Sequence, residues 1–207
     1  MRDGTWSDHD RMRQRMLAAA RRLVVRKGIS GLSVRRLASE LKVSVGTIYY
    51  YFRDIDEVML ALNEETLRAL LAALEAAAEA AAGRPAALVD AYFDFIAANG
   101  KRWHLLFAHF PPRGYPIPES YVAAIESAVA RVSAVLVPHL QPLAPEARRD
   151  VTVGLWAMLH GLSMLEQQGK LGRIGGESPL RQIAHATVSR ALGLEGAAQL
   201  SSAQEMS

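Results

Sequence analysis

Apolar residues recur at intervals of three and four through most of the 207-residue chain, the spacing that places them along one face of an α-helix. The first such stretch runs from Asp8 or Asp10, either of which can cap a helix, to Lys27, and Gly28 follows as a stop signal. No internal repeat and no pair of strands with alternating polarity is evident in the sequence. The pattern predicts an all-α protein.

Each of the next three helices is preceded by a residue type that caps helix N-termini. The expected helices span residues 34–41, 45–52 and 55–82, and their caps are Ser33, Ser44 and Asp54. The third of them is long enough, at about 1.5 Å per residue, to connect two domains. Gly83 and Pro85 then interrupt the pattern and restart it.

Helical periodicity continues in the second half of the chain. The helices expected there span residues 85–99, 102–110, 119–137, 146–168 and 178–192. Gly100 is the expected stop of the first of these helices, and four prolines between residues 111 and 118 exclude a helix in that segment. We therefore place domain boundaries after residues 53, 82 and 194, and expect the tail 195–207 to fray.

Charge is distributed unevenly along the chain, whose net charge is +3. Residues 1–53 carry 12 Lys/Arg and 4 Asp/Glu, a balance of +8, whereas the remaining residues carry 12 and 17, a balance of −5. A basic end on an otherwise acidic protein indicates a polyanionic partner. A solvated basic face is the alternative explanation.

Composition also limits the cellular setting. The chain has no cysteine, which excludes disulfides and thiolate metal ligands and fits a reducing cytoplasm. No apolar run approaches the roughly 18–20 residues needed to cross a bilayer. The first ten residues are polar and mixed in charge, unlike a secretory signal. We expect a cytoplasmic protein without a membrane span.

The segment from Ser33 to Phe52 has the pattern of a helix-turn-helix, in which two short helices are joined by three or four residues. Val43, Ile48 and Phe52 recur at helical spacing and are expected to face a core together with two leucines of the preceding helix, Leu37 and Leu41. Small and hydrogen-bonding residues are left to form the outer face of the second helix.

That outer face suits double-stranded DNA. Gly46 has no side chain and lets the helix approach the groove closely, hydroxyl groups can bind phosphates, and Val45 and Tyr50 can contact base edges. The candidate DNA-binding residues are Ser33, Arg35, Ser44, Val45, Gly46, Thr47, Tyr49, Tyr50 and Tyr51. Arg35, Arg36 and Arg53 add salt-dependent attraction. The alternative is a three-helix core in which the tyrosines simply pack.

Residues 38–52 match the pattern A-x-x-x-x-V-S-x-G-T-[LI]-Y-x-[YH]-F in one ungapped run. This segment resembles the DNA-binding segment of TetR-type transcriptional regulators, and the resemblance covers about residues 10–60. Two positions depart from the pattern of such regulators. Val45 occupies a position that is often lysine. The small-Lys-acid turn after the phenylalanine is here Asp54-Ile55-Asp56, so the lysine expected to contact a phosphate is missing. Backbone N–H groups at the start of the next helix can still hold that phosphate, although Asp54 and Asp56 would weaken the site.

The resemblance implies the domain roles. Residues 8–53 would form a helix-turn-helix DNA-binding domain, residues 54–82 a connecting helix, and residues 83–194 a helical domain for ligand binding and dimerisation. Such regulators are homodimers that bind a nearly palindromic DNA operator, usually as repressors, and release it when a small-molecule effector binds. The dimer helices would be residues 146–168 and 178–192, with contacts from Val151, Leu155, Leu159, Leu162, Ile183 and Val188.

The effector is not identified by the sequence, but aromatic and histidine residues cluster in the second domain. Trp156 and His160 lie four residues apart on one helix face, and with Gly161 they resemble a Trp-x-x-x-His-Gly signature of one subgroup of TetR-type ligand domains. The candidate ligand-binding residues are Phe93, Trp103, His104, Phe107, Trp156 and His160. The alternative for each of them is packing in the core.

Catalytic motifs are missing from the sequence. His104, His109, His139 and His160 form no H-E-x-x-H pattern, and there is neither a G-x-S-x-G elbow nor a phosphate-cradling glycine loop. We expect no enzyme activity, no cofactor and no metal. A protein that binds a membrane surface through the basic amphipathic helix 8–27 is the competing class. The neighbouring helix-turn-helix pattern favours DNA.

Overall fold

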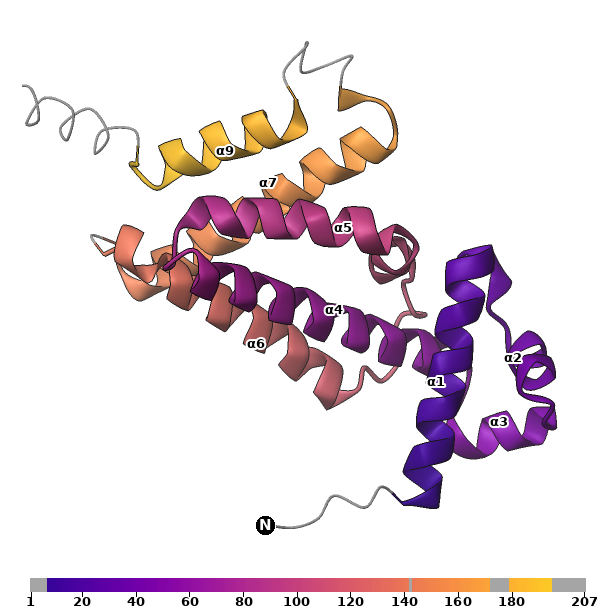
Figure 1. Cartoon of the computed structure of the whole chain (residues 1–207). Helices are drawn as coiled ribbons and strands as arrows, with labels where there is room; N and C mark the ends of the chain where they lie inside the picture. Colours follow the sequence, from indigo (N-terminus) through magenta and orange to yellow (C-terminus); the bar gives the residue numbers. More distant parts are fainter. Residues whose placement is uncertain (1–6, 142, 172–178, 195–207) are drawn as a thin grey trace, which may run out of the picture. The chain divides into compact units, whose positions relative to one another are not determined.

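A computed structural model describes residues 7–141, 143–171 and 179–194, and the regular secondary structure of these residues is entirely helical (Figure 1). The α-helices are α1 (Asp8–Lys27), α2 (Val34–Leu41), α3 (Val45–Tyr51), α4 (Ile55–Ala80), α5 (Pro85–Ala108), α6 (Glu119–Leu136), α7 (Pro145–Gln167) and α9 (Leu180–Ala191). Short 3-10 helices, η1 (Ile29–Gly31) and η2 (Val137–His139), follow α1 and α6. The all-α fold expected from the sequence is confirmed.

Side-chain caps fix where the N-terminal helices begin. Ser33 accepts a hydrogen bond from the Arg36 N–H at 3.3 Å, and Ser44 accepts one from the Thr47 N–H at 3.0 Å, as the sequence predicted. The cap of α1 was predicted wrongly. Ser7, not an aspartate, accepts from the Asp10 N–H at 3.1 Å, and both aspartates lie in the first turn, where negative charge is favourable.

The helix expected to stop at Gly100 instead continues to Ala108 as part of α5. The backbone leaves helical geometry at Asn99 (φ −123°, ψ 23°), which produces a kink, and then returns to it. Gly100 does not adopt the left-handed conformation with which a glycine ends a helix. Buried Ile96 and Trp103 continue the apolar face on both sides of the kink, so the helix resumes.

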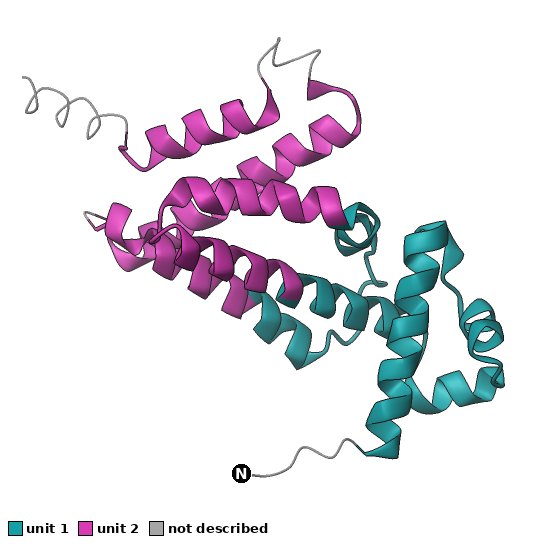
Figure 2. Ribbon diagram, in the orientation of Figure 1, with its two compact units in different colours: residues 1–68, 99–125 teal, residues 69–98, 126–207 magenta. Residues whose placement is uncertain are grey.

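The chain divides into two compact units (Figure 2), unit 1 with residues 1–68 and 99–125 and unit 2 with residues 69–98 and 126–207. In unit 1, α1, α2 and α3 pack against one another. The largest fully buried side chains of this core include Met16, Leu37, Ile48 and Phe52. Leu105, from the far end of α5, belongs to the same apolar cluster.

Unit 2 is built around the packing of α7 against α9. Leu159 of α7 and Val188 of α9 are both buried. Two buried hydroxyls on α7 are hydrogen-bonded, as burial of a polar group requires. Thr152 donates to the Arg148 carbonyl at 2.9 Å and accepts from Ser133 at 3.1 Å, and Ser163 donates to the His160 carbonyl at 2.8 Å.

Glu119–His139, which comprises α6 and η2, corrects another expectation. By length and composition this segment is apolar enough to cross a bilayer, although we expected no such run. Glu126 and Arg131 lie within it, and Val122 and Ile125 are about two-fifths exposed. One helix of this kind is a weak indication of a membrane span.

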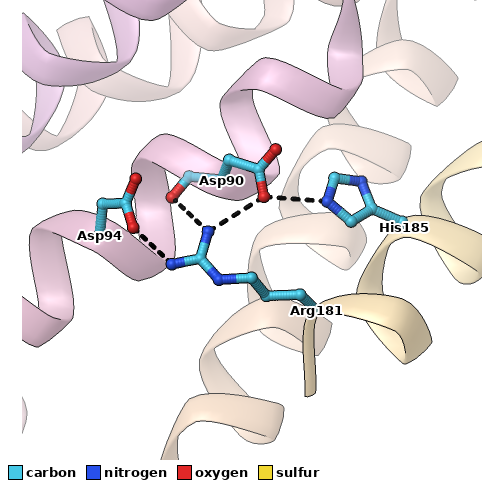
Figure 3. A network of polar contacts seen from close by, with 4 residues as sticks. All are labelled: Asp90, Asp94, Arg181 and His185. Carbon is cyan, nitrogen blue, oxygen red and sulfur yellow. Dashed lines mark hydrogen bonds and ion pairs between the residues drawn. The ribbon is translucent and has the colours of Figure 1, made fainter. Parts of the chain in front are cut away.

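A polar network joins α5 to α9 within unit 2 (Figure 3). The Arg181 guanidinium donates to the Asp90 carboxylate at 3.0 Å, to the Asp90 carbonyl at 3.3 Å, and to the Asp94 carboxylate. His185 Nε2 lies 3.0 Å from the same Asp90 oxygen. Partial burial acts to raise the pKa of Asp90, but the hydrogen bonds from His185 and Arg181 outweigh it and hold the pKa below its ordinary value.

This network predicts a pH-dependent contribution to stability. Because the pKa of Asp90 is lower in the folded than in the unfolded state, the contribution is present above the ordinary aspartate pKa of about 3.9 and is lost as the pH falls through the folded value. Asp90→Asn should lower the melting temperature at pH 7 by about 1–3 °C, a small effect because the pair is half-exposed. Circular dichroism melts at pH 7 and pH 3 measure it.

The difference between Asp90→Asn and the wild type should be smaller at pH 3 than at pH 7, because the contribution of the ionised carboxylate decreases below the ordinary aspartate pKa. The matched control is Asp150→Asn, since Asp150 is exposed and makes no hydrogen bond or ion pair to other described residues. An equal difference at both pH values would show that packing, not charge, explains the effect.

Candidate nucleic-acid interface

The two faces of α3 differ sharply in burial. Ile48 is fully buried and Phe52, at the C-cap, is 1% exposed, whereas Tyr49 is 54% and Tyr50 75% exposed. The core positions predicted from the sequence are therefore confirmed, with Val43 half-buried against the same cluster. Burial of one face fixes the position of α3, while the two tyrosines on the other face stay exposed. The exposed face is therefore a rigid surface that a partner can reach.

The serine hydroxyls of the predicted site also hold the starts of the helices. Ser44 Oγ accepts the Thr47 N–H and lies 2.8 Å from Thr47 Oγ1, so one of these hydroxyls donates to the other. Ser33 plays the corresponding role at the start of α2. Ser44 is exposed and Thr47 is half-buried, and both lie at the N-terminal end of α3. A phosphate here would meet hydroxyls that the helix itself has oriented.

Gly46 is exposed, and the protein leaves space around it. A Cβ atom added at this position would come within 4 Å only of Ser44 Oγ, at 3.6 Å. Its φ is not in the left-handed region, so the backbone does not require glycine either. Internal packing therefore gives no reason for a glycine here, whereas close approach to an external surface does.

Three arginines were predicted to attract DNA phosphates, and their surroundings in the structure differ. Arg35 is exposed and makes no hydrogen bond or ion pair to other described residues. Arg36 donates to the Ser30 carbonyl at 2.7 Å, which braces the turn before α2. The Arg53 guanidinium lies over the Tyr115 ring, 5.6 Å from its centroid.

One residue of this surface was missed in the sequence. His9, at the start of α1, packs against Tyr51 at a tilt, with ring centroids 4.6 Å apart, and against Tyr50 edge to face, with centroids 6.0 Å apart. Tyr50 and Tyr51 are themselves 5.1 Å apart. The cluster therefore extends the exposed face of α3 onto α1. No local pattern could show this contact, because the residues are more than 40 positions apart.

The candidate ligand-binding residues fall in both units. In unit 2, Phe93 is buried, and Trp156 stacks on His160 with ring centroids 5.8 Å apart. Burial lowers the pKa of His160, so its imidazole is neutral at pH 7. In unit 1, Trp103 is buried and packs on Phe107 at 4.7 Å, whereas His104 is exposed. Among the described residues, no group of three or more His, Asp or Glu could hold a metal.

Two family models match the chain. Residues 16–62 match the model described as bacterial regulatory proteins, tetR family, and residues 85–191 match the model described as tetracyclin repressor-like, C-terminal domain. The chain belongs to the TetR family of bacterial regulatory proteins. Proteins of this family are transcription regulators, not enzymes.

The chain is also similar to a curated relative over its N-terminal part and to solved structures in its fold. The nicotine-responsive repressor HdnoR of Paenarthrobacter nicotinovorans is 36% identical over 62 residues, 30% of this chain and 32% of the relative. The chain thus matches about a third of the length of its curated relatives. A protein of unknown function from Rhodococcus sp. RHA1 has a TM-score of 0.69 at 24% identity, with 93% and 97% of the two chains covered. The multidrug binding protein EbrR, complexed with imidazole, has a TM-score of 0.57 at 23% identity, with 86% and 93% covered.

The structure explains one departure from the pattern of TetR-type regulators. Ile55, where such regulators often carry a lysine, is half-buried and packs against the core of unit 1. The first turn of α4 also carries Asp56 and Glu57. Ile55 therefore provides packing at this position and no positive charge.

Gly46 offers a test that separates folding from binding. Gly46→Ala should leave the melting temperature unchanged or raise it, because alanine is favoured over glycine in a helix by roughly 0.5–1 kcal/mol and the site has room. The same change should weaken binding to duplex DNA by about tenfold or more, because the added methyl group holds α3 away from the base edges. Thermal melts and fluorescence anisotropy measure the two effects.

Gly100→Ala is the matched control, since a Cβ at this exposed helical glycine also meets open space. It should show the stability effect without a loss of DNA affinity. Wild-type affinity in Gly46→Ala would contradict the close approach.

Proposed function

We propose that this TetR-family protein is a transcriptional repressor that binds a nearly palindromic DNA operator as a homodimer and releases it when a small molecule binds. The observation that carries the proposal is the exposed face of α3, where Tyr49, Tyr50 and an unconstrained Gly46 lie opposite a fully buried Ile48. The basic balance of residues 1–53 supplies the attraction for phosphates.

The proposed DNA contacts are those of the sequence pattern, with roles refined by their surroundings. They are Ser33, Arg35, Ser44, Val45, Gly46, Thr47, Tyr49, Tyr50 and Tyr51. Val45 and Tyr50 are exposed enough to touch base edges, while the hydroxyls at the helix starts suit phosphates. Residues 8–53 are the proposed DNA-binding domain, 54–82 the connecting helix, and 83–194 the ligand-binding and dimerisation domain.

The homodimer is proposed to form through α7 and α9. Val153 and Trp156, three residues apart on α7, are 40% and 44% exposed, which is high for large apolar side chains. A second copy of the helix pair would cover them. Leu159 and Val188 are already buried within one chain, which favours intrachain packing for these two, whereas the half-exposed Leu155 and Ile183 remain available. This exposure favours a dimer contact over a ligand contact for Trp156.

The effector is proposed to be an apolar or aromatic small molecule. EbrR, a fold neighbour over most of the chain, is a multidrug binding protein, and HdnoR is nicotine-responsive, although its match is confined to 62 residues. Within unit 2, Phe93 is the candidate for an aromatic contact and the neutral His160 for a hydrogen bond, whereas Trp103 and Phe107 remain candidates from the sequence pattern alone. The Trp-x-x-x-His-Gly subgroup remains a prediction from the sequence.

The competing class, a membrane-surface protein, is disfavoured by α1. Met16, Leu17, Leu23 and Val24 form the apolar face of this helix and are at most 3% exposed. A membrane-binding helix needs that face free to enter the lipid.

In vitro selection of duplexes from a random library by the full-length protein tests the proposal. The expected result is an inverted repeat with half-sites about one helical turn apart. Affinity for the selected duplex should fall at least tenfold between about 50 and 200 mM salt, because phosphate contacts release counterions. Tyr49→Ala should weaken binding by about tenfold, while light scattering shows the same dimer as the wild type.

Tyr121→Ala is the control for loss of a tyrosine outside α3. Selection without enrichment, or salt-independent binding, would overturn DNA recognition. A monomer in light scattering would overturn the dimer alone.

A further inference from the structure

The segment between α5 and α6, residues 109–118, contacts the turn that follows α3. Tyr115 OH donates to Asp54 Oδ1 at 2.7 Å, and His109 Nε2 lies 2.7 Å from Asp56 Oδ1. The Tyr115 ring also faces the guanidinium of Arg53. All of these residues belong to unit 1. They join two segments more than 50 residues apart, one from each family model.

The backbone of this segment is built to hold Tyr115. Its four prolines restrict φ, and the Tyr115 N–H closes a turn onto the Pro112 carbonyl at 2.9 Å. Gly114, inside that turn, has φ +83°, a conformation that glycine adopts without strain. His109, whose side chain is 7% exposed, anchors the beginning of the segment. Tyr115 is therefore presented by a stiff loop.

Tyr115 acts on the two residues that directly follow Phe52. Asp54 Oδ1 accepts both the Tyr115 hydroxyl and the Glu57 N–H, at 2.7 and 2.9 Å, so the tyrosine is bonded to the group that caps α4. The Arg53 N–H donates to Glu57 Oε2 at 2.8 Å, which fixes the backbone of Arg53 while its side chain stays exposed. The Tyr115 ring then restricts where that guanidinium can lie.

The ionisation states suit this arrangement. Burial and the bond to Asp54 raise the pKa of Tyr115, which keeps its hydroxyl a donor. Partial burial acts to raise the pKa of Asp54, but the bonds from the Glu57 N–H and Tyr115 outweigh it and lower the pKa, which keeps the carboxylate a charged acceptor. The hydrogen bond is thus charge-assisted.

We propose that Tyr115 is a positioning residue for DNA binding, which places the Arg53 guanidinium at the C-terminal end of α3 so that it can contact a DNA phosphate. The inference rests on the proposed function. The proposal gives a role in DNA binding to a residue that lies in the part of the chain matched by the C-terminal family model. Arg53 takes over the charge that Ile55 does not provide.

Three variants test this role on the duplex selected by the wild-type protein. Tyr115→Phe keeps the ring over Arg53 and loses the bond to Asp54, and we expect a weakening of about twofold to fivefold. Tyr115→Leu loses both contacts, and we expect about fivefold to twentyfold. In Tyr115→Leu the slope of log affinity against log salt should also fall by about one, as for the loss of one phosphate contact. Arg53→Gln should show the same loss of slope.

The double variant Tyr115→Leu/Arg53→Gln distinguishes positioning from a general structural defect. If Tyr115 acts through Arg53, the double variant has the slope of Arg53→Gln alone. Tyr121→Leu, a half-buried tyrosine whose hydroxyl makes no hydrogen bond to other described residues, is the control and should keep the wild-type slope. Thermal melts establish that each variant is folded.

A wild-type slope in folded Tyr115→Leu, or additive slope losses in the double variant, would overturn the inference while leaving DNA binding intact. If Tyr115→Leu fails to fold, Tyr115→Phe is the test, and unchanged DNA affinity in that variant would overturn the role of the hydroxyl. A wild-type salt slope in Arg53→Gln would overturn the phosphate contact. No binding of the wild type to any duplex would overturn the proposed function and this inference with it.

Discussion

The position of α3 depends on the burial of two side chains. A helix of seven residues does not hold itself together in water, since helices shorter than about 12 residues are marginal alone. Ile48 and Phe52 provide the missing stability by packing into the core made by α1 and α2, where complete burial of each contributes roughly 1.5–3 kcal/mol. The opposite face is then rigid without being covered. That combination lets glycine, tyrosine and hydroxyl groups meet a partner in a fixed geometry.

A second set of contacts joins this core to residues far along the chain. Leu105 lies in the same apolar cluster, and the Lys101 ammonium donates to the Val25 carbonyl at 2.6 Å near the end of α1. Tyr115 and His109 bind the start of α4. Part of the second family module is thus a structural component of unit 1. A displacement of residues 99–125 would therefore change the contacts of the core that holds α3 directly.

Local signals were enough to predict most helices and the faces of α3. Ser33 and Ser44 cap where the sequence placed them, because capping depends on a few adjacent atoms. The errors have a common cause. Gly100 stays helical because apolar packing on both sides outweighs the tendency of glycine to end a helix. The contacts of His9 and Tyr115 join residues far apart in the chain, so no short stretch of sequence could predict them. The placement of the ligand candidates was open for the same reason, since an aromatic residue at helical spacing is equally suited to core and pocket.

The apolar residue at Ile55 and the contacts of Tyr115 with Asp54 and Arg53 affect the same property, the charge at the start of α4. Half-burial of Ile55 strengthens the junction between α3 and α4 but removes a cation from the start of α4, which already carries Asp54 and Asp56. Two uncompensated carboxylates there would repel a phosphate backbone. In the structure each is bonded to a side chain of the 109–118 segment, and the Arg53 guanidinium faces the ring of Tyr115, which binds Asp54. An isolated helix-turn-helix domain that ends near residue 82 would lose His109 and Tyr115. Its DNA affinity should therefore be lowered, although it keeps every one of the proposed DNA-contacting residues.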